Sequence, residues 1–417
     1  MRKKYDTEEK EEESSRISGK AARKKKNFKI ALGVTLGVVF LALACLFIWR
    51  HQIINYFTTP DKEAVNEPAT YIKKKPADTG STDTEPVNEF PEMTEDVYNF
   101  LICGYDRVAN LSDVNMLVSF NVKYLTVSIM QIPRDTYVNY ESWYHKANGV
   151  FQYFMTGNSY NEDIQRRLDQ FDVNTEQEMR GIAGFAAFLE DNLCVKIHYY
   201  AVMDLEEFAN IVDALGGVEM YVPRRMYYED PNQTPPLYID LYEGYQTLDG
   251  KAAEGVVRFR NTYGNGDIGR GNVQKMFMAA LFKTIQSKTN IFNAGKIIDV
   301  CNIISDNLVT NMSTSDMIYF ANNLMTVNLQ YVTFMTLPGN AFWGDDQLSY
   351  YSLNKEATLE YINKYFNIYS EQVTLDQFDA NGAFFNYSYV YSAPASDSAQ
   401  FIYDAEQMTN GDFDPVT

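Results

Sequence analysis

Residues 100–132 read FLICGYDRVANLSDVNMLVSFNVKYLTVSIMQI and contain three apolar runs separated by short polar segments. The first run, 100–106, ends in a loop, and a turn of hairpin length separates the second and third runs, 115–122 and 125–132. Short runs rich in β-branched and aromatic residues predict strands. We therefore expect three strands here, of which the last two form a hairpin.

Helix signals follow this strand segment. Thr175-x-x-Glu178 and Asp204-x-x-Glu207 are both capping-box patterns, in which two side chains satisfy free N–H groups at a helix start. The second predicted helix ends at Gly216-Gly217, and predicted strands over 196–203 and 218–222 bracket it. Because strand and helix alternate, the sequence predicts an α/β fold, a three-layer α/β/α domain with a central mixed sheet.

This domain is predicted to span residues 96–370. Its later elements are a strand over 255–260, helices over 271–287, 293–306 and 314–325, and a strand over 329–337. Residues 371–417 contain eight acidic residues and no Lys or Arg, and they are interpreted as an acidic C-terminal extension.

A membrane anchor is predicted ahead of the domain. Residues 30–49 carry no charge over 20 positions, which matches the length of a transmembrane helix; a cleaved signal peptide is the alternative. Lys and Arg gather before this span, so the positive-inside rule makes residues 1–29 a cytoplasmic charged tail. Proline-rich residues 50–95 are then an extracytoplasmic linker. The expected location is the cell membrane, with a single span and an external domain.

The charge distribution limits the possible ligands. The formal net charge is −19; residues 1–29 hold 11 Lys/Arg against 6 Asp/Glu, or +5, so residues 30–417 carry −24. A strongly acidic domain argues against nucleic acid as a partner, because phosphate binding needs cations. Four cysteines and three histidines show no zinc-ligand spacing. Any anionic ligand must therefore meet a local basic cluster.

Four arginines and a glutamine are candidate binding residues for such a ligand. Arg258 and Arg260 lie two apart on a predicted strand, which directs both side chains to one face; a surface salt-bridge ladder is the alternative. Arg270 and Gln274 are four apart and share one face of a predicted helix. Arg134 follows a predicted strand, where it projects from a loop at the end of the sheet.

Three acidic residues accompany these cations. Asp106 follows the first strand, Asp113 precedes the second, and Asp267 lies where a loop enters a helix. Asx-turns and an N-cap are the ordinary alternatives for these positions. Ligands of open α/β sheets collect at strand ends. Guanidinium groups match phosphate oxygens and paired carboxylates hold Mg²⁺, so the set predicts a magnesium-dependent diphosphate site.

Taken in chain order, these fragments resemble the LytR-CpsA-Psr family of envelope glycopolymer transferases over about residues 97–370. The resemblance rests on these motifs: Gly104-x-Asp106; Ser112-Asp113 before 116–119; Ile132-Pro-Arg-Asp135; Lys146-x-Asn148; 208–217; 244–250; Val257-Arg-x-Arg260; and Asp267-x-Gly-Arg270 with Gln274. A single N-terminal span before an external domain is also the usual architecture of that family.

The resemblance implies a reaction. A teichoic-acid-like or capsule-like glycopolymer passes from a polyprenyl-pyrophosphate carrier to a hydroxyl of peptidoglycan, with a possible pyrophosphatase side activity. It also implies that Asp106 and Asp113 help to bind Mg²⁺. The same resemblance assigns the pyrophosphate to Arg134, Arg258, Arg260, Arg270 and Gln274, and Arg134 is also a catalytic candidate. The residue that accepts the hydroxyl proton is Asp113 or Asp267, and the sequence does not choose between them.

Two further expectations accompany the resemblance. A hydrophobic tunnel holds the lipid tail, and 185–189 and 208–215 are candidates to line it, with core packing as the alternative. Leu111 and Val273 stand where the family usually has arginine. These departures keep a non-catalytic polyprenyl-phosphate-binding protein and an envelope regulator open as alternatives.

Overall fold

The computed structural model describes residues 94, 96–139, 145–233, 236–260, 267–288, 308–324, 326–379, 382–384 and 403–409. The predicted tail, transmembrane helix and linker of residues 1–95 lie almost wholly outside these residues, as does the helix predicted over 293–306. No helix in the described part of the chain has both the length and the apolar character to cross a membrane.

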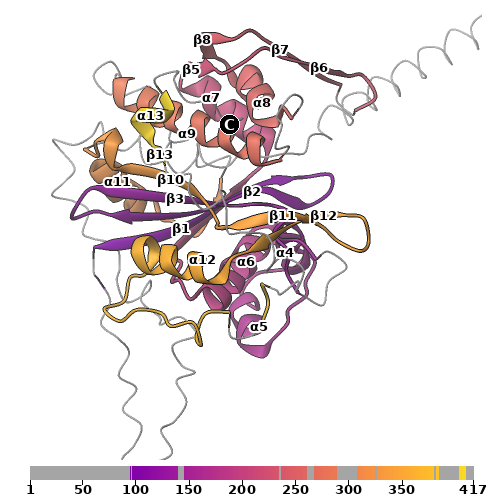
Figure 1. The fold of residues 1–417 in the computed structure, drawn as a ribbon, viewed down its shortest axis with the longest axis vertical. Helices are drawn as coiled ribbons and strands as arrows, with labels where there is room; N and C mark the ends of the chain where they lie inside the picture. The colour runs from indigo at the N-terminus through magenta and orange to yellow at the C-terminus, as the bar shows by residue number, and fades with distance from the viewer. Residues whose placement is uncertain are drawn as a thin grey trace, which may run out of the picture.

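A seven-stranded mixed sheet forms the centre of the domain (Figure 1). Its spatial order is β13 (Tyr403–Asp404), β10 (Val332–Thr336), β3 (Thr126–Ile132), β2 (Leu111–Asn121), β1 (Val97–Asp106), β4 (Tyr199–Met203) and β9 (Val309–Thr310). The pairs β1–β4 and β3–β10 are parallel and the other pairs are antiparallel. The predicted central mixed sheet and the hairpin of β2 and β3 are confirmed.

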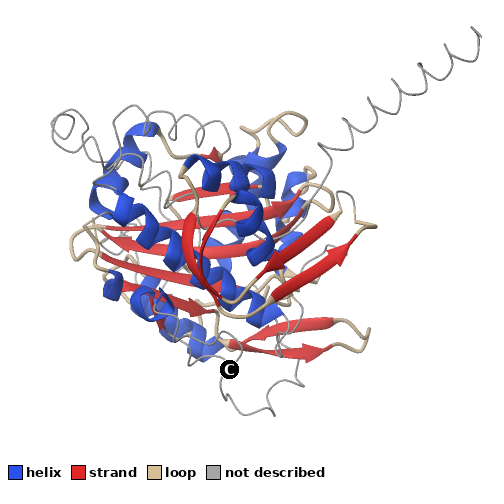
Figure 2. Ribbon diagram, turned by 90° about the horizontal axis from the view of Figure 1, so that it is seen from above, coloured by secondary structure: helices blue, strands red, loops and turns tan. Residues whose placement is uncertain are grey.

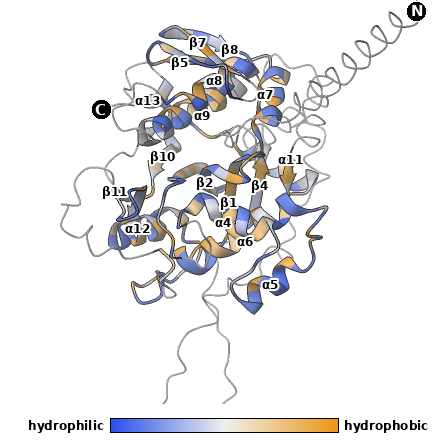
Figure 3. Cartoon of the chain, turned by 90° about the vertical axis from the view of Figure 1, so that its right-hand side faces the viewer, coloured by the Kyte–Doolittle hydropathy of each residue, from blue (hydrophilic) through white to orange (hydrophobic). Residues whose placement is uncertain are grey.

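Helices cover both faces of this sheet (Figures 2 and 3). One layer holds α7 (Leu205–Ala214), α8 (Gly250–Arg258), α9 (Asp267–Lys288), α11 (Thr314–Leu324) and α13 (Ala405–Thr409). The other holds α4 (Ala147–Met155), α5 (Glu162–Leu168), α6 (Gln177–Leu193), α12 (Lys355–Tyr361) and the π-helical turn Ile362–Phe366. This arrangement explains why β1 and β2 are apolar on both faces.

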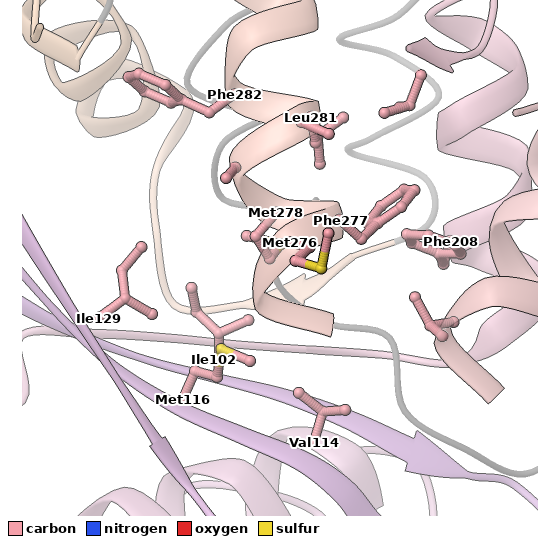
Figure 4. Packing of buried hydrophobic residues seen from close by; sticks show 14 of the residues in the cluster. Ile102, Val114, Met116, Ile129, Phe208, Met276, Phe277, Met278, Leu281 and Phe282 are labelled. Carbon is pink, nitrogen blue, oxygen red and sulfur yellow. The ribbon is translucent and has the colours of Figure 1, made fainter. Parts of the chain in front are cut away.

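The strand period of two assigns alternate residues of β1 to two separate cores. Phe100 and Ile102 pack toward α7, α8 and α9, whereas Leu101 and Cys103 pack toward α4 and α6. In the first core, α9 lies over Ile102, Val114 and Met116 of the sheet, and its Phe277 points toward Phe208 of α7, with 5.3 Å between the ring centroids (Figure 4). Segments 185–189 and 208–215 belong to different cores on opposite sides of the sheet, so they do not line one common tunnel.

Three two-stranded sheets complete the fold. They pair β5 (Val218–Val222) with β8 (Gly244–Leu248), β6 (Met226–Asp230) with β7 (Leu237–Leu241), and β11 (Gly339–Trp343) with β12 (Ser349–Leu353). A short 3-10 helix, Leu329–Tyr331, precedes β10.

The two predicted capping boxes have different outcomes. Asp204 and Glu207 form a complete capping box at the start of α7, and Gly216 and Gly217 supply the positive φ angles of 76° and 87° that end this segment. The prediction at Thr175 is wrong. Helix α6 begins after Glu176 without a side-chain cap, because the Glu178 carboxylate accepts a hydrogen bond from the Tyr105 hydroxyl instead.

The strand predicted over 255–260 is also wrong, because these residues belong mostly to α8. Asp249 caps the helix by accepting a hydrogen bond from the Ala252 backbone N–H at 2.8 Å. Ala253, Val256 and Val257 then recur at helical spacing and are buried against the sheet layer. The β-branched pair suggested a strand, whereas packing of this face selects a helix.

Parts of the predicted acidic extension pack on the domain. Val373, Phe378 and Phe384 are buried in the α4–α6 core, β13 pairs with β10, and α13 contacts α9. The described residues of 371–417 are therefore structural members of the α/β domain.

Candidate functional site

Two carboxylates lie where β1 ends and β2 begins. Asp106 and Asp113 are 7% and 6% exposed. The Oδ1 atom of Asp106 accepts a hydrogen bond from the Val108 N–H at 2.6 Å, which is the Asx-turn alternative considered above. Burial raises the pKa of Asp106, and the charge of Asp113 adds to this effect, while backbone N–H groups and Arg258 oppose it. The two predicted metal ligands are thus close enough to interact electrostatically.

Arg134 joins this pair from the end of β3. Its Nη1 atom lies 2.7 Å from Oδ1 of Asp113, and its Nε atom lies 3.8 Å from Asp135, which Lys146 contacts at 2.8 Å. The Asn148 N–H donates to the carbonyl oxygen of Arg134 at 3.1 Å. The start of α4 therefore holds the arginine loop in place over the ends of the strands.

Arg258 of α8 lies near enough to Asp106 for their charges to interact. Its Nη1 atom is 2.8 Å from Oε1 of Glu254, one helical turn earlier, and the residue is 6% exposed. Burial lowers the pKa of Arg258, and nearby Arg260 adds to this, while Glu254 and Asp106 oppose it. Arg260 lies just beyond the helix and is exposed. The prediction that both arginines lie on one face of a strand is wrong, because Arg258 ends a helix with its side chain buried while Arg260 follows the helix and is exposed; their charges still interact.

The first turns of α9 complete the site. Arg270 is 2% exposed, and Gln274, one turn later, donates to the Val257 carbonyl oxygen at 3.1 Å. Gln274 also accepts a hydrogen bond from Nε2 of Gln131 at 3.0 Å. These contacts attach α9 to the end of β3 and to the last turn of α8, beside Arg258. Asp267 opens α9, and its side chain lies outside the described residues.

Several participating residues were missed by sequence reasoning. Gln131 links α9 to β3 through its hydrogen bond to Gln274. Glu254 pairs with Arg258 four residues later, a spacing that predicts an ion pair only if the segment is a helix. Arg107 forms ion pairs of 2.7 Å with both Asp204 and Glu207. No local pattern indicated the Arg107 pairs, because its partners are about 100 residues away in sequence.

Burial also gives this edge of the site an unusual acid. Burial and the neighbouring Asp204 charge raise the pKa of Glu207 to about 7, although the Asp204 N–H and Arg107 act in the opposite direction. Arg107 therefore contacts one carboxylate whose pKa lies above its usual value.

Leu111 and Val273 occupy different environments. Leu111 is the cross-strand partner of Asp106, so an apolar side chain lies beside one of the two carboxylates. Val273 is fully buried in the core shared by α7, α8 and α9. The four predicted cations, Arg134, Arg258, Arg260 and Arg270, come from three separate segments.

The carboxylate pair suits Mg²⁺. This ion commonly binds through one or two carboxylates together with water and substrate phosphates, and the Arg134 contact uses one oxygen of Asp113. Within the described ranges, no group of three or more acidic, histidine or cysteine side chains gathers around a possible ion position. Asp106 and Asp113 fit a metal that is shared with a phosphorylated ligand.

Known proteins are similar in sequence to part of this chain. Cell wall biosynthesis protein LcpA of Corynebacterium glutamicum is 25% identical over 247 residues, covering 59% of this chain and 46% of that protein. Polyisoprenyl-teichoic acid–peptidoglycan teichoic acid transferase TagU of Bacillus licheniformis is 25% identical over 262 residues, covering 60% and 73%. This chain thus spans about half the length of LcpA.

One crystal structure supports the same fold assignment. Protein gbs0355 from Streptococcus agalactiae matches with a TM-score of 0.50 and 17% identity, covering 65% of this chain and 86% of that one. The LytR_cpsA_psr family model matches residues 56–367, which is more than half of the chain. The fold, the ordered motifs and this match agree, and the chain belongs to the LytR_cpsA_psr family.

Proposed function

We propose that this protein is a membrane-anchored phosphotransferase that moves a glycopolymer from a polyprenyl-pyrophosphate carrier to peptidoglycan. The observation that carries the proposal is that, at one end of the sheet, Arg134 pairs with Asp113 and the charge of Arg258 acts on neighbouring Asp106. The family membership and the transferase name of the Bacillus relative support it. A teichoic-acid-like or capsule-like polymer is the proposed donor.

Guanidinium groups suit the donor because phosphoryl transfer depends chiefly on positioning and on neutralising oxygen charge. Arg134, Arg258, Arg260 and Arg270 would hold the pyrophosphate, with Gln274 as a neutral donor. Mg²⁺, held by Asp106 and Asp113, would supply additional neutralisation of the phosphate oxygens. The buried setting of Arg258 and Arg270 strengthens these interactions relative to water.

The reaction joins a peptidoglycan hydroxyl oxygen to the phosphorus nearest the glycopolymer. The bond from that phosphorus to the bridging oxygen breaks, so a phosphodiester forms and polyprenyl monophosphate leaves. The hydroxyl proton passes to a carboxylate, for which Asp113 and Asp267 are the candidates. Replacing the hydroxyl by water would give the pyrophosphatase side reaction.

The proposed location follows from the same chemistry. A polyprenyl carrier resides in a membrane, and residues 30–49 are the proposed single-pass anchor with a cytoplasmic N-terminus. This topology would place the domain on the side of the membrane where peptidoglycan is found.

The test uses the purified full-length chain with a lipid-pyrophosphate-linked glycan, peptidoglycan and Mg²⁺. Covalent attachment should fall at least about 10–100-fold in Arg134→Ala and in Arg258→Ala, because each loses charge-assisted hydrogen bonds. Arg166→Ala is the matched control, since Arg166 is an exposed arginine on α5. Equal attachment by all three variants and the wild type would refute the assignment.

A non-catalytic polyprenyl-phosphate-binding protein is the second candidate. The apolar residues Leu111 and Val273, where the family usually has arginine, favour it. Under this alternative a polyprenyl phosphate would copurify with the chain, and added peptidoglycan would gain no covalent glycopolymer.

A further inference from the structure

The β11–β12 hairpin is attached to the loop that carries Arg134. The Tyr351 N–H donates to the Asp135 carbonyl oxygen at 2.8 Å, and the Tyr137 N–H donates to the Tyr351 carbonyl oxygen at 2.7 Å. Thr136 bridges Tyr351 in parallel register. The hairpin is therefore hydrogen-bonded to the residue that follows Arg134, the arginine that contacts Asp113, and it lies beside the central sheet in Figure 1.

One face of this hairpin is packed against the domain by aromatic contacts. Phe342 and Tyr350 stack at 5.6 Å between ring centroids, and Tyr137 meets Tyr350 edge-on at 5.1 Å. His145 stacks on Tyr137 at 5.5 Å, and the ammonium of Lys146 lies 5.2 Å from the Tyr350 ring centroid. These contacts fix the orientation of the hairpin relative to the Arg134 loop.

The opposite face presents a tryptophan to solvent. The register pairs Trp343 with Ser349 and Ala341 with Tyr351, so Trp343 and Ala341 share the face away from Phe342 and Tyr350. Trp343 is 75% exposed, and Ala341 is exposed beside it. Leu348, 52% exposed, adjoins Trp343 at the tip, where the Gly344 N–H donates to the Leu348 carbonyl oxygen at 2.9 Å. Two large apolar side chains exposed together on a fixed hairpin form a patch of the kind that marks a binding surface.

The surrounding groups indicate the chemistry of the partner. The turn after Trp343 carries Asp345, Asp346 and Gln347, all exposed. Asp346 is held in place, since it accepts hydrogen bonds from the Leu348 N–H at 3.0 Å and from the Tyr350 hydroxyl. An indole face beside fixed carboxylate and amide groups suits a pyranose ring, whose polarised C–H groups face the π cloud while its hydroxyls donate to the acceptors.

Two other partners fit less well. Insertion of Trp343 and Leu348 into a bilayer would carry the Asp345 and Asp346 carboxylates to the same depth or deeper, which is strongly unfavourable for charged groups. The same carboxylates repel an anionic polymer or lipid headgroup. The surface therefore favours a polysaccharide with an uncharged backbone.

We infer that the Trp343 face of the β11–β12 hairpin binds the acceptor glycan strand of peptidoglycan through stacking on an amino-sugar ring. This inference rests on the proposed function, because it assigns the acceptor of the same reaction. The hairpin would orient the strand so that a hydroxyl approaches the phosphate held beside Arg134. Trp343 is thus a positioning residue for the acceptor and makes no contact with the pyrophosphate.

The test compares Trp343→Ala with the wild-type full-length chain. Binding to purified peptidoglycan and to the uncharged oligosaccharide chitotetraose should weaken about tenfold, because a stacked ring is lost. Trp343→Phe should retain most of the affinity, since it keeps an aromatic face. Tyr124→Ala is the matched control, because Tyr124 is a 67% exposed ring in the β2–β3 turn at the other end of the sheet.

Kinetics separate this inference from the proposed function. In Trp343→Ala the KM for peptidoglycan should rise about tenfold, while the affinity for the lipid-linked donor and kcat at saturating acceptor remain unchanged. Unchanged glycan binding in Trp343→Ala would overturn the inference, and so would Trp343-dependent binding to phosphatidylglycerol vesicles in place of glycan. If the wild type binds glycan through Trp343 but transfers nothing, the proposed function fails and the glycan surface stands.

Discussion

Replacing Lys275 by methionine should stabilise the protein, because this lysine of α9 is fully buried. Lys275 is 0% exposed, and its Nζ atom donates to Oγ1 of Thr336 at 2.7 Å. Burial lowers the pKa of Lys275 from 10.5 to about 7. Methionine has a similar length and removes the need to keep an amine in an apolar site.

The magnitude follows from this pKa. In the unfolded chain the Lys275 amine keeps its proton up to about pH 10.5, whereas in the folded protein the amine loses the proton near pH 7. This shift lowers the free energy of unfolding by about 5 kcal/mol at and below pH 7. Loss of the Thr336 hydrogen bond offsets about 1 kcal/mol. We expect Lys275→Met to raise the free energy of unfolding by roughly 3–4 kcal/mol at pH 7.

The pH dependence gives the prediction its specificity. Between pH 7 and 10.5 the unfolded wild type binds more protons than the folded one, so wild-type stability gains a rising contribution with pH. The advantage of the variant should therefore shrink by about 2 kcal/mol from pH 7 to pH 9. Denaturant unfolding of both proteins at the two pH values measures this, with exposed Lys283 on the same helix as a Lys283→Met control. A gap that is the same at both pH values, or a loss of stability at pH 7, would show that the reasoning is wrong.

Two further predictions concern buried charges and a helix cap. Glu190→Gln should destabilise the fold by about 3 kcal/mol at pH 7, because Glu190 is 1% exposed and contacts Arg167 at 2.7 Å and Lys196 at 3.4 Å. Burial raises the pKa of Glu190, but the two cations outweigh it and lower the pKa below 4.5. The difference in unfolding free energy between wild type and Glu190→Gln should therefore become smaller when unfolding is repeated at pH values below 4.5. A difference that does not change with pH contradicts this. Asp204→Ala should lower the free energy of unfolding by about 1–2 kcal/mol, because α7 loses its N-cap. Thermal unfolding measures this, and an unchanged midpoint would show that the cap does not stabilise the fold.

Local signals predicted the elements whose residues agree with their tertiary environment. The hairpin of β2 and β3 was predictable because its apolar runs are buried on both faces. The capping box of Asp204 and Glu207 was predictable because both partners lie within one helical turn. Glu178 misled the same reasoning, since the Tyr105 hydroxyl is a partner 73 residues away. Local pattern therefore decides an element only where no distant group competes for its side chains.

The site shows the same division. Asp106, Asp113, Arg134 and Arg258 were identifiable as a set because their residue types suit a diphosphate with Mg²⁺. Their arrangement was not, because Arg258 approaches Asp106 from a helix end that depends on packing of α8. The burial that raises the pKa of Asp106 and lowers that of Arg258 likewise arises only after folding.

The net charge of −19 explains why this local arrangement matters for an anionic ligand. At distances beyond about 8–10 Å an acidic surface is screened at physiological ionic strength, so the groups in contact decide binding. Gln131, Gln274 and the Val257 carbonyl connect β3, α9 and α8 through hydrogen bonds of 3.0 and 3.1 Å, which keeps Arg258 and Arg270 at the same end of the sheet. Without these hydrogen bonds Arg258 and Arg270 would lose the contacts that hold their helices together at one end of the sheet. The neutral amides are therefore as necessary to the proposed anion site as the cations that they hold in place.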